Sequence, residues 1–425
     1  MNVAGPPAAA PAAAAATART SFPRLMVSLG FASGALSALF AGAGTVLLPQ
    51  QVENIDRAHK VAVLGVIAGV SATFALVCNP IGGALSDRTR SRFGRRTPWL
   101  VFAPAVLLVL VAWLGGIRSV PVLLVAWCLA QSVVNLYQAP LTAVIPDRVS
   151  VARRGAASSV TGVAAVVGGV AGVGLASLFA ARVGWGYLVL GLLVTVTAVS
   201  FVLATDEPPS DGPRAALPRR GRGGPSGLGA FLSALTHRDF ACVFASRAAS
   251  ILGYFLVISY ELYILTDYIR VPAGMRPAEG VTVLAAIAAV GALLAAAIAG
   301  PLSDRLGRRK PFVFVSSAIA GAGCVLPVLS PTFGAVEIYA AFAGLAFGTY
   351  LSVDAALVTL VLPRGEDAAR DLGVLNIANA GPQVLAPLFA ALIISHLGGY
   401  RVLFIIGGCC GIVGAIAVLP VRSVR

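Results

Sequence analysis

The sequence contains very little charge for its length. Only 11% of its 425 residues are charged and 58% are hydrophobic, whereas a soluble domain carries about 25% charged residues. The only lysines are Lys60 and Lys310, and neither follows a glycine-rich phosphate-binding loop. The composition therefore excludes a soluble globular protein, and an ATP-driven pump would need its nucleotide-binding loop on a partner chain.

Residues that bind metals or form disulfides are also scarce. The six cysteines lie in apolar runs without a CxxC pair, and His59, His237 and His396 form no cluster. We therefore expect no disulfide framework, no metal site and no cofactor. A membrane-embedded enzyme is disfavoured because no histidine lies deep in an apolar run. The net charge of +14 resides in short loops between apolar runs, which disfavours nucleic acid as a partner.

Long apolar runs dominate what is present. Each is long enough to supply the ~20 residues that cross a bilayer, and together they predict an all-α integral membrane protein with twelve transmembrane helices. The predicted spans are 24–48, 61–85, 98–117, 120–145, 155–181, 185–204, 240–266, 280–302, 311–330, 335–362, 372–395 and 401–420.

A proline- and arginine-rich segment separates six spans from six. The predicted units are a disordered cytoplasmic tail (1–23), an N-terminal six-helix bundle (24–204), a cytoplasmic linker (205–239), a C-terminal six-helix bundle (240–420) and a cytoplasmic C-terminus (421–425). This topology puts 23 basic residues on the cytoplasmic side and 7 on the other. Because basic loops stay in the cytoplasm, we expect a multi-pass protein of the cell membrane with both termini inside.

A charged motif occurs twice, 217 residues apart: GGALSDRTRSRFGRRTPW (82–99) follows the second span and AGPLSDRLGRRKPF (299–312) follows the eighth. This pattern resembles the loop signature of the major facilitator superfamily. The longer copy is similar to that of sucrose transporters and glycoside–cation symporters, as are LTDYI (265–269) and VDAAL…DLGVLNIANAGPQVLAP in the tenth and eleventh spans. The resemblance implies two pseudo-symmetric bundles that expose a shared site alternately to each side of the membrane.

The resemblance also implies that the repeated motif gates transport. Asp87 can pair with Arg95 or Arg96 and hold the halves together on the cytoplasmic side in one state. The simpler alternative is that these arginines only fix the topology. The predicted gating residues are Asp87, Arg88, Gly94, Arg95, Arg96, Asp304, Arg305, Gly307, Arg308 and Arg309.

Ionisable residues inside a bilayer are costly and usually mark a pathway. Asp354 in the tenth span is the best candidate for a carboxylate that binds a coupling H⁺ or Na⁺, and Glu261 in the seventh is the second. The alternative for Asp354 is permanent pairing, for example with Arg247. Sugar symporters of this subgroup usually carry an acidic residue in the first or second span, where this sequence has only Asn79.

Polar side chains recur at helical spacing in several spans. The predicted substrate and coupling residues are Arg247, Tyr254 and Glu261 in the seventh span, Gln131, Asn135 and Gln138 in the fourth, Tyr350 and Asp354 in the tenth, and Asn376, Asn379 and Gln383 in the eleventh. The resemblance implies that the first, fourth, seventh and tenth spans line a central cavity. Amide bonds between helices are the alternative role for these stripes.

We therefore expect a monomeric secondary transporter of a small polar solute, such as a sugar or glycoside, coupled to H⁺ or Na⁺. The alternative is a proton-coupled exporter of drugs or metabolites from the same superfamily. Such exporters typically combine glycine with proline in the fifth span, and the absence of proline there disfavours this alternative. A sensor that keeps the fold without transporting remains a third possibility.

Overall fold

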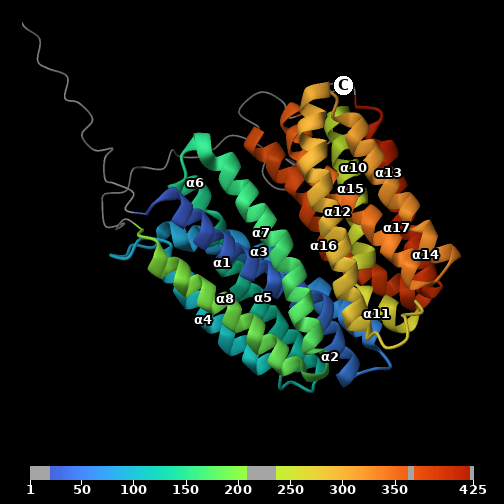
Figure 1. Ribbon diagram of the computed structural model, residues 1–425, viewed down its shortest axis with the longest axis horizontal. Coiled ribbons are helices and arrows are strands. Elements are labelled where there is room, and N and C mark those ends of the chain that lie inside the picture. Colours follow the sequence, from blue (N-terminus) through green and yellow to red (C-terminus); the bar gives the residue numbers. More distant parts are fainter. Residues whose placement is uncertain (1–19, 208–235, 362–367, 422–425) are drawn as a thin grey trace, which may run out of the picture.

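The computed structural model describes residues 20–207, 236–361 and 368–421, and nearly all of them are helical (Figure 1). The N-terminal half contains α1 (Phe22–Gly42), η1 (Ala43–Leu47), α2 (Leu48–Ile55), α3 (Lys60–Arg88), α4 (Thr97–Leu114), α5 (Val120–Thr142), α6 (Val144–Arg148), η2 (Val151–Arg153), α7 (Arg154–Leu178), η3 (Ala180–Arg182) and α8 (Val183–Ala204). The C-terminal half contains α10 (Arg238–Ile258), α11 (Glu261–Asp267), α12 (Pro277–Leu306), α13 (Lys310–Gly323), α14 (Val325–Leu329), α15 (Phe333–Val361), α16 (Ala368–His396) and α17 (Gly399–Val418).

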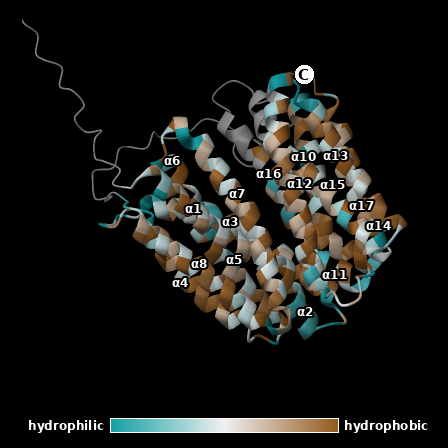
Figure 2. Ribbon diagram, in the orientation of Figure 1, coloured by the Kyte–Doolittle hydropathy of each residue, from teal (hydrophilic) through white to brown (hydrophobic). Residues whose placement is uncertain are grey.

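Twelve helices in the described ranges are long and apolar enough to cross a membrane, six in each half. A helix satisfies its own backbone hydrogen bonds, which is what a chain requires where no water is present. Large apolar side chains such as Phe31, Val109 and Leu203 are exposed on the outside of the bundles. Figure 2 shows hydrophobic residues along the bodies of the helices and hydrophilic ones gathered toward their ends. The predicted all-α fold with twelve spans is confirmed.

Small residues bring helices into backbone contact within each half. A Cβ added at Gly168 or Gly172 of α7 would overlap the backbone of α1, and one added at Gly344 or Gly348 of α15 would overlap the backbone of α12. Membrane helices pack through such small residues because lipid supplies no hydrophobic driving force between them. Gly168 and Gly172 of the fifth span therefore serve close helix packing.

Four predicted spans differ from the structure. The fourth is divided at Ala143 into α5 and α6, and the ninth is divided at Cys324 into α13 and α14. The first was expected to end at residue 48, but α1 continues through the π-helical turn η1 into α2 and ends at Ile55. The seventh was expected to be one helix over 240–266, but a turn at Ser259 and Tyr260 divides it into α10 and α11. Gly44 and Pro49 mark the change in the first span, whereas no glycine or proline lies at Ser259 and Tyr260, where tertiary contacts decide the break. Most of the predicted linker and tail lies outside the described residues.

Candidate functional site

The two halves are joined at the end that carries α2 and α11, which we call the sealed end. Lys60, the first residue of α3, places its Nζ 3.0 Å from a carboxylate oxygen of Glu53 and 2.8 Å from one of Asp267, which belongs to the other half. The Lys60 side chain is only 10% exposed. The Tyr400 hydroxyl donates to the second Asp267 oxygen at 2.7 Å. A nearly buried cation thus bridges the halves.

Tyrosine hydroxyls add two further bonds across the seal. Tyr260 donates to the Val61 carbonyl at 2.8 Å, and Tyr263 donates to the Pro49 carbonyl at 2.7 Å. The ring of Tyr263 also lies under the Lys60 ammonium, which is 4.7 Å from the ring centroid.

Close packing completes the seal. A Cβ at Gly65 of α3 would lie 2.5 Å from the Ala391 Cβ of α16, and one at Gly69 would lie 2.5 Å from the Leu388 side chain. These cross-half contacts all lie in the parts of α3 and α16 near the sealed end. Figure 1 shows the bundles converging there and diverging toward the end that carries α6.

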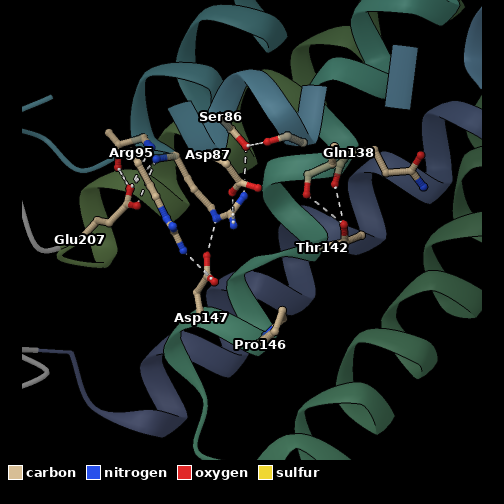
Figure 3. A network of polar contacts seen from close by, with 12 residues as sticks. Ser86, Asp87, Arg95, Gln138, Thr142, Pro146, Asp147 and Glu207 are labelled. Carbon is tan, nitrogen blue, oxygen red and sulfur yellow. Dashed lines mark hydrogen bonds and ion pairs between the residues drawn. The ribbon is translucent and has the colours of Figure 1, made fainter. Parts of the chain in front are cut away.

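The opposite end carries the first copy of the repeated motif, and we call it the network end. Arg96 is 5% exposed and donates to Asp87 at 3.0 Å, to the Ser86 hydroxyl at 3.0 Å and to Asp147. Arg95 contacts Asp147 at 2.8 Å. Figure 3 shows these groups converging on the loop between α3 and α4. The predicted pairing of Asp87 with Arg96 is confirmed, and every partner that the described residues supply to this network belongs to the N-terminal half.

Glu207, just past the end of α8, is a member of this network that sequence reasoning missed. Its carboxylate accepts from the backbone N–H of Arg96 at 3.0 Å and from the N–H and hydroxyl of Thr97, both at 2.8 Å. A carboxylate at the first turn of α4 satisfies free N–H groups and the helix dipole. Gly94 has φ +95° and would place a Cβ 2.4 Å from that carboxyl group, so this turn requires glycine.

The second motif copy repeats the backbone turn. Gly307 has φ +60°, which matches the left-handed conformation of Gly94. Arg305 and Arg308 are exposed, as is Arg88 in the first copy, and Arg309 is half-buried. The Asp304 side chain lies outside the described part of the structure.

Glu261 lies at the turn between α10 and α11. Its half-buried carboxylate is near enough to interact electrostatically with the hydroxyls of Tyr254 and Tyr339. No ion pair or hydrogen bond joins it to another residue in the described ranges. The helix break does not separate the predicted pair of Tyr254 and Glu261, while Tyr339 of α15 is an unpredicted neighbour.

Each bundle contains a small cavity between equivalent spans. In the N-terminal half it has a volume of about 30 Å³ between α1, α4 and α5, and Gln131 is its one polar side chain. In the C-terminal half it has a volume of about 40 Å³ between α10, α13 and α15. This second cavity is lined by the hydroxyl-bearing residues Ser250, Tyr254, Ser316, Ser317 and Tyr350. The polar lining is therefore concentrated in the C-terminal half.

The other predicted residues occupy several places. Asn135 and Gln138 accept hydrogen bonds from Asn79 of α3 at 3.4 and 3.1 Å, which joins the second and fourth spans. This is the helix-to-helix role that was the alternative for their stripe. Arg247 on α10 and Asn379 and Gln383 on α16 are half-buried. Asp354 and Asn376 lie on α15 and α16, and their side chains are outside the described part.

Two six-span helical bundles joined at one end form the architecture of many membrane transporters. A family model described as MFS/sugar transport protein matches residues 30–393, and the chain belongs to this family. It is therefore a transporter and not an enzyme. Among curated proteins, no sequence matches significantly.

Solved structures share the fold at low sequence identity. The nucleoside transporter NupG, in a point-mutant form, is 12% identical with a TM-score of 0.76, over 93% of this chain and 99% of that chain. A bacterial homologue of the human lysosomal transporter Spinster, in an inward-facing and unoccupied conformation, is 15% identical with a TM-score of 0.68, over 94% and 95% of the two chains. The inward-facing and occupied structure of the same homologue is 15% identical with a TM-score of 0.67, over 93% of this chain and 94% of that chain.

Proposed function

We propose that this transporter moves a small polar solute, of the sugar or glycoside type, by alternating access coupled to H⁺ or Na⁺. The observation that carries the proposal is the asymmetry between the two ends. Cross-half contacts close the sealed end, whereas among the described residues the ionic network at the opposite end stays within one half. A carrier that exposes its site to one compartment at a time must close one end by contacts between its halves, and the sealed end supplies such contacts.

The basic loops favour an assignment of the network end to the cytoplasm, since Arg88 to Arg96 and Arg305 to Lys310 both belong there under the positive-inside rule. The conformation is then inward-facing, and the bridge of Lys60 with Asp267 is the outer gate. Solute entry from outside requires that bridge to break.

The chemistry of the C-terminal half supports a hydroxyl-rich solute. Ser250 and Ser317 share a hydrogen bond of 3.0 Å, and the Tyr254 ring stacks on Phe347 with centroids 4.7 Å apart. Hydroxyls beside aromatic faces suit sugars, and they also suit the ribose of nucleosides, the solute class named for the structural relative NupG. A cavity of about 40 Å³ holds little more than one water, so the solute would bind in the space between the bundles.

Glu261 and Asp354 are the proposed coupling carboxylates. A carboxylate that is largely removed from water and lacks a cationic partner gains from binding H⁺ or Na⁺. Glu261 meets this description among the described residues. Asp354 remains a candidate by its position on α15.

Uptake into proteoliposomes tests the coupling. Solutes are first selected by a thermal-shift screen against sugars, glycosides, nucleosides and cationic drugs. Glu261→Gln or Asp354→Asn should then abolish cation-driven accumulation while solute binding persists. Glu279→Gln is the control, because Glu279 is exposed and pairs with Arg276 beside it. Full accumulation by both carboxylate variants would remove these residues from the mechanism, and stabilisation by cationic drugs alone would favour an exporter.

A further inference from the structure

A large cavity lies at the sealed end, and all of its lining residues belong to the N-terminal half. Its volume is about 720 Å³, inside the range of ~300–1,000 Å³ typical of small-ligand sites. Its walls are the end of α2, the loop between α4 and α5, and the junction of α7 with α8. Transport by alternating access assigns no role to it.

Two arginines give this cavity a positive charge. Arg118 and Arg182 both line it and both are exposed, and no ion pair or hydrogen bond joins either side chain to another residue in the described ranges. None of the lining residues is acidic. At the same end, Arg57 pairs with Glu53 and Arg276 pairs with Glu279, whereas no ion pair in the described ranges involves Arg270 or Arg401 of the other half. Two like charges without a counter-charge favour an anion in the cavity.

The start of α8 adds backbone donors to the same wall. Val183, Gly184 and Trp185 form its first turn and line the cavity. α8 is 22 residues long, and its N-cap residue Arg182 makes no side-chain hydrogen bond to the helix. The backbone N–H groups of its first turn therefore receive no side-chain cap. Such a helix end attracts phosphate.

Gln51 supplies an independent indication of a ligand. The residue is 4% exposed, and its Nε2 donates to the carbonyls of Leu114 and Ile117 at 2.7 and 3.2 Å. Its Oε1 is buried and has no hydrogen-bond partner in the described part of the chain. Gln51 lines the cavity, but water does not reach its Oε1 in this conformation, so a ligand hydroxyl could donate to this acceptor only after the side chain turned toward the cavity.

The cavity lies where the spans end. Spans Phe22–Ile55, Thr97–Leu114 and Ala180–Ala204 all reach it with a terminus. Trp185 is 58% exposed there, as is typical of indoles at the membrane–water interface. We propose that this cavity binds a phosphate ester that carries free hydroxyls, held by Arg118, Arg182 and the first turn of α8. Both a phosphoglycerol lipid headgroup and a soluble phosphate ester have this chemistry.

Binding by the purified full-length chain tests the proposal. The probes are phosphatidylglycerol, phosphatidylcholine and soluble glycerol 1-phosphate, measured by native mass spectrometry and by thermal shift. The wild type should bind phosphatidylglycerol or glycerol 1-phosphate at least about tenfold more tightly than Arg118→Gln/Arg182→Gln, because two charge-assisted contacts are lost. The matched control is Arg270→Gln/Arg401→Gln, which removes two exposed arginines from the other half and should bind as the wild type does.

The lipid probe and the soluble probe distinguish the two possible sources of the phosphate group. Retention of phosphatidylglycerol alone identifies a lipid site, and binding of glycerol 1-phosphate identifies a site for soluble esters. Equal binding by the wild type and the cavity variant, equal loss in the control variant, or no binding of either probe by the wild type would overturn the proposal. The variant Arg118→Lys/Arg182→Lys retains the charge and should bind with intermediate affinity, which guards against a folding defect in the glutamine variant.

Discussion

The two ends of the molecule use ionic networks of similar composition in different ways. At the sealed end, Lys60 connects carboxylates from both halves through contacts of 2.8 and 3.0 Å. At the network end, Arg96 connects Asp87 and Asp147, which belong to the same half. Both cations are nearly buried, so burial alone does not distinguish the networks. The difference is that the carboxylates around Arg96 belong to one half, whereas those around Lys60 belong to both halves. Only the Lys60 contacts must therefore break when the halves separate at that end.

Removal of the Lys60 ammonium should have the largest effect on the seal. Lys60→Gln leaves the carboxylates of Glu53 and Asp267 close together without their cation. Breaking a buried pair costs ~3–5 kcal/mol, and we expect about 2–3 kcal/mol here because Asp267 is partly exposed. The sealed conformation should lose about 30- to 150-fold in relative population.

Reaction of a cysteine at Ala391 with an impermeant maleimide measures this loss in a background with all six native cysteines replaced. Arg57→Gln is the control, because Arg57 pairs with the same Glu53 but its side chain is 84% exposed. Unchanged labelling in Lys60→Gln would mean that packing alone holds the seal.

A wedge in the close packing should have the next largest effect. Gly65→Leu puts a side chain where even a Cβ would lie 2.5 Å from Ala391. Overpacking costs about 1–3 kcal/mol, all of it in the sealed conformation, so labelling from the sealed end should rise by about tenfold. Because Gly65 contacts Ala391 itself, the reporter cysteine is placed at Leu388. Gly83→Leu on the same helix has nothing within 4 Å of its Cβ and should leave the labelling rate unchanged.

Weakening the network end should lower the free energy of unfolding without opening the seal. Arg96→Gln removes charged hydrogen bonds to Asp87 and Asp147, and we expect a loss of about 2 kcal/mol of unfolding free energy, measured by thermal unfolding. Labelling at Ala391 should stay at the wild-type rate. Arg92→Gln is the control, because Arg92 is exposed in the same loop. Faster labelling in Arg96→Gln would show that the network contributes to the seal after all.

The smallest effect is expected at Gly94. Gly94→Ala requires a non-glycine residue at φ +95° and moves the Glu207 carboxylate away from the start of α4. The expected cost is about 1–2 kcal/mol of stability, with solute turnover slowed slightly. Gly155→Ala, which has open space around its Cβ, should be neutral or slightly stabilising. Equal stability of the two variants would contradict the role of Glu207.

Most of the fold follows from the sequence because apolar length and loop charge act locally. The limits of α3, α4, α8 and α17 lie within a few residues of the predicted ones, and Asp87 pairs with Arg96 as the motif suggested. The cross-half seal could not be predicted, since Lys60 and Asp267 are 207 positions apart and no periodicity relates helices of different halves. A signal did exist: Lys60 is one of two lysines among 31 basic residues, at the start of an apolar run.

The turn at Ser259 and Tyr260 was missed for a related reason. Helical periodicity over 240–266 is continuous in the sequence, but the Tyr260 hydroxyl bonds to Val61 and Pro387, which are remote in the chain. Glu207 was missed because its partners, Arg96 and Thr97, lie more than a hundred residues earlier. Local patterns predict the spans, whereas long-range polar contacts accompany the break in the seventh span and join the two halves.

Reciprocal movement of the two ends is the central claim, and spin-label distances test it most directly. One label pair at Ser119 and Leu397 reports on the sealed end, and another at Ser150 and Leu306 reports on the network end; all four positions are exposed. In Lys60→Gln the first distance should lengthen and the second should shorten in equal fractions of the molecules, relative to the otherwise unmodified chain. A longer first distance with an unchanged second would show local opening only and would contradict alternating access.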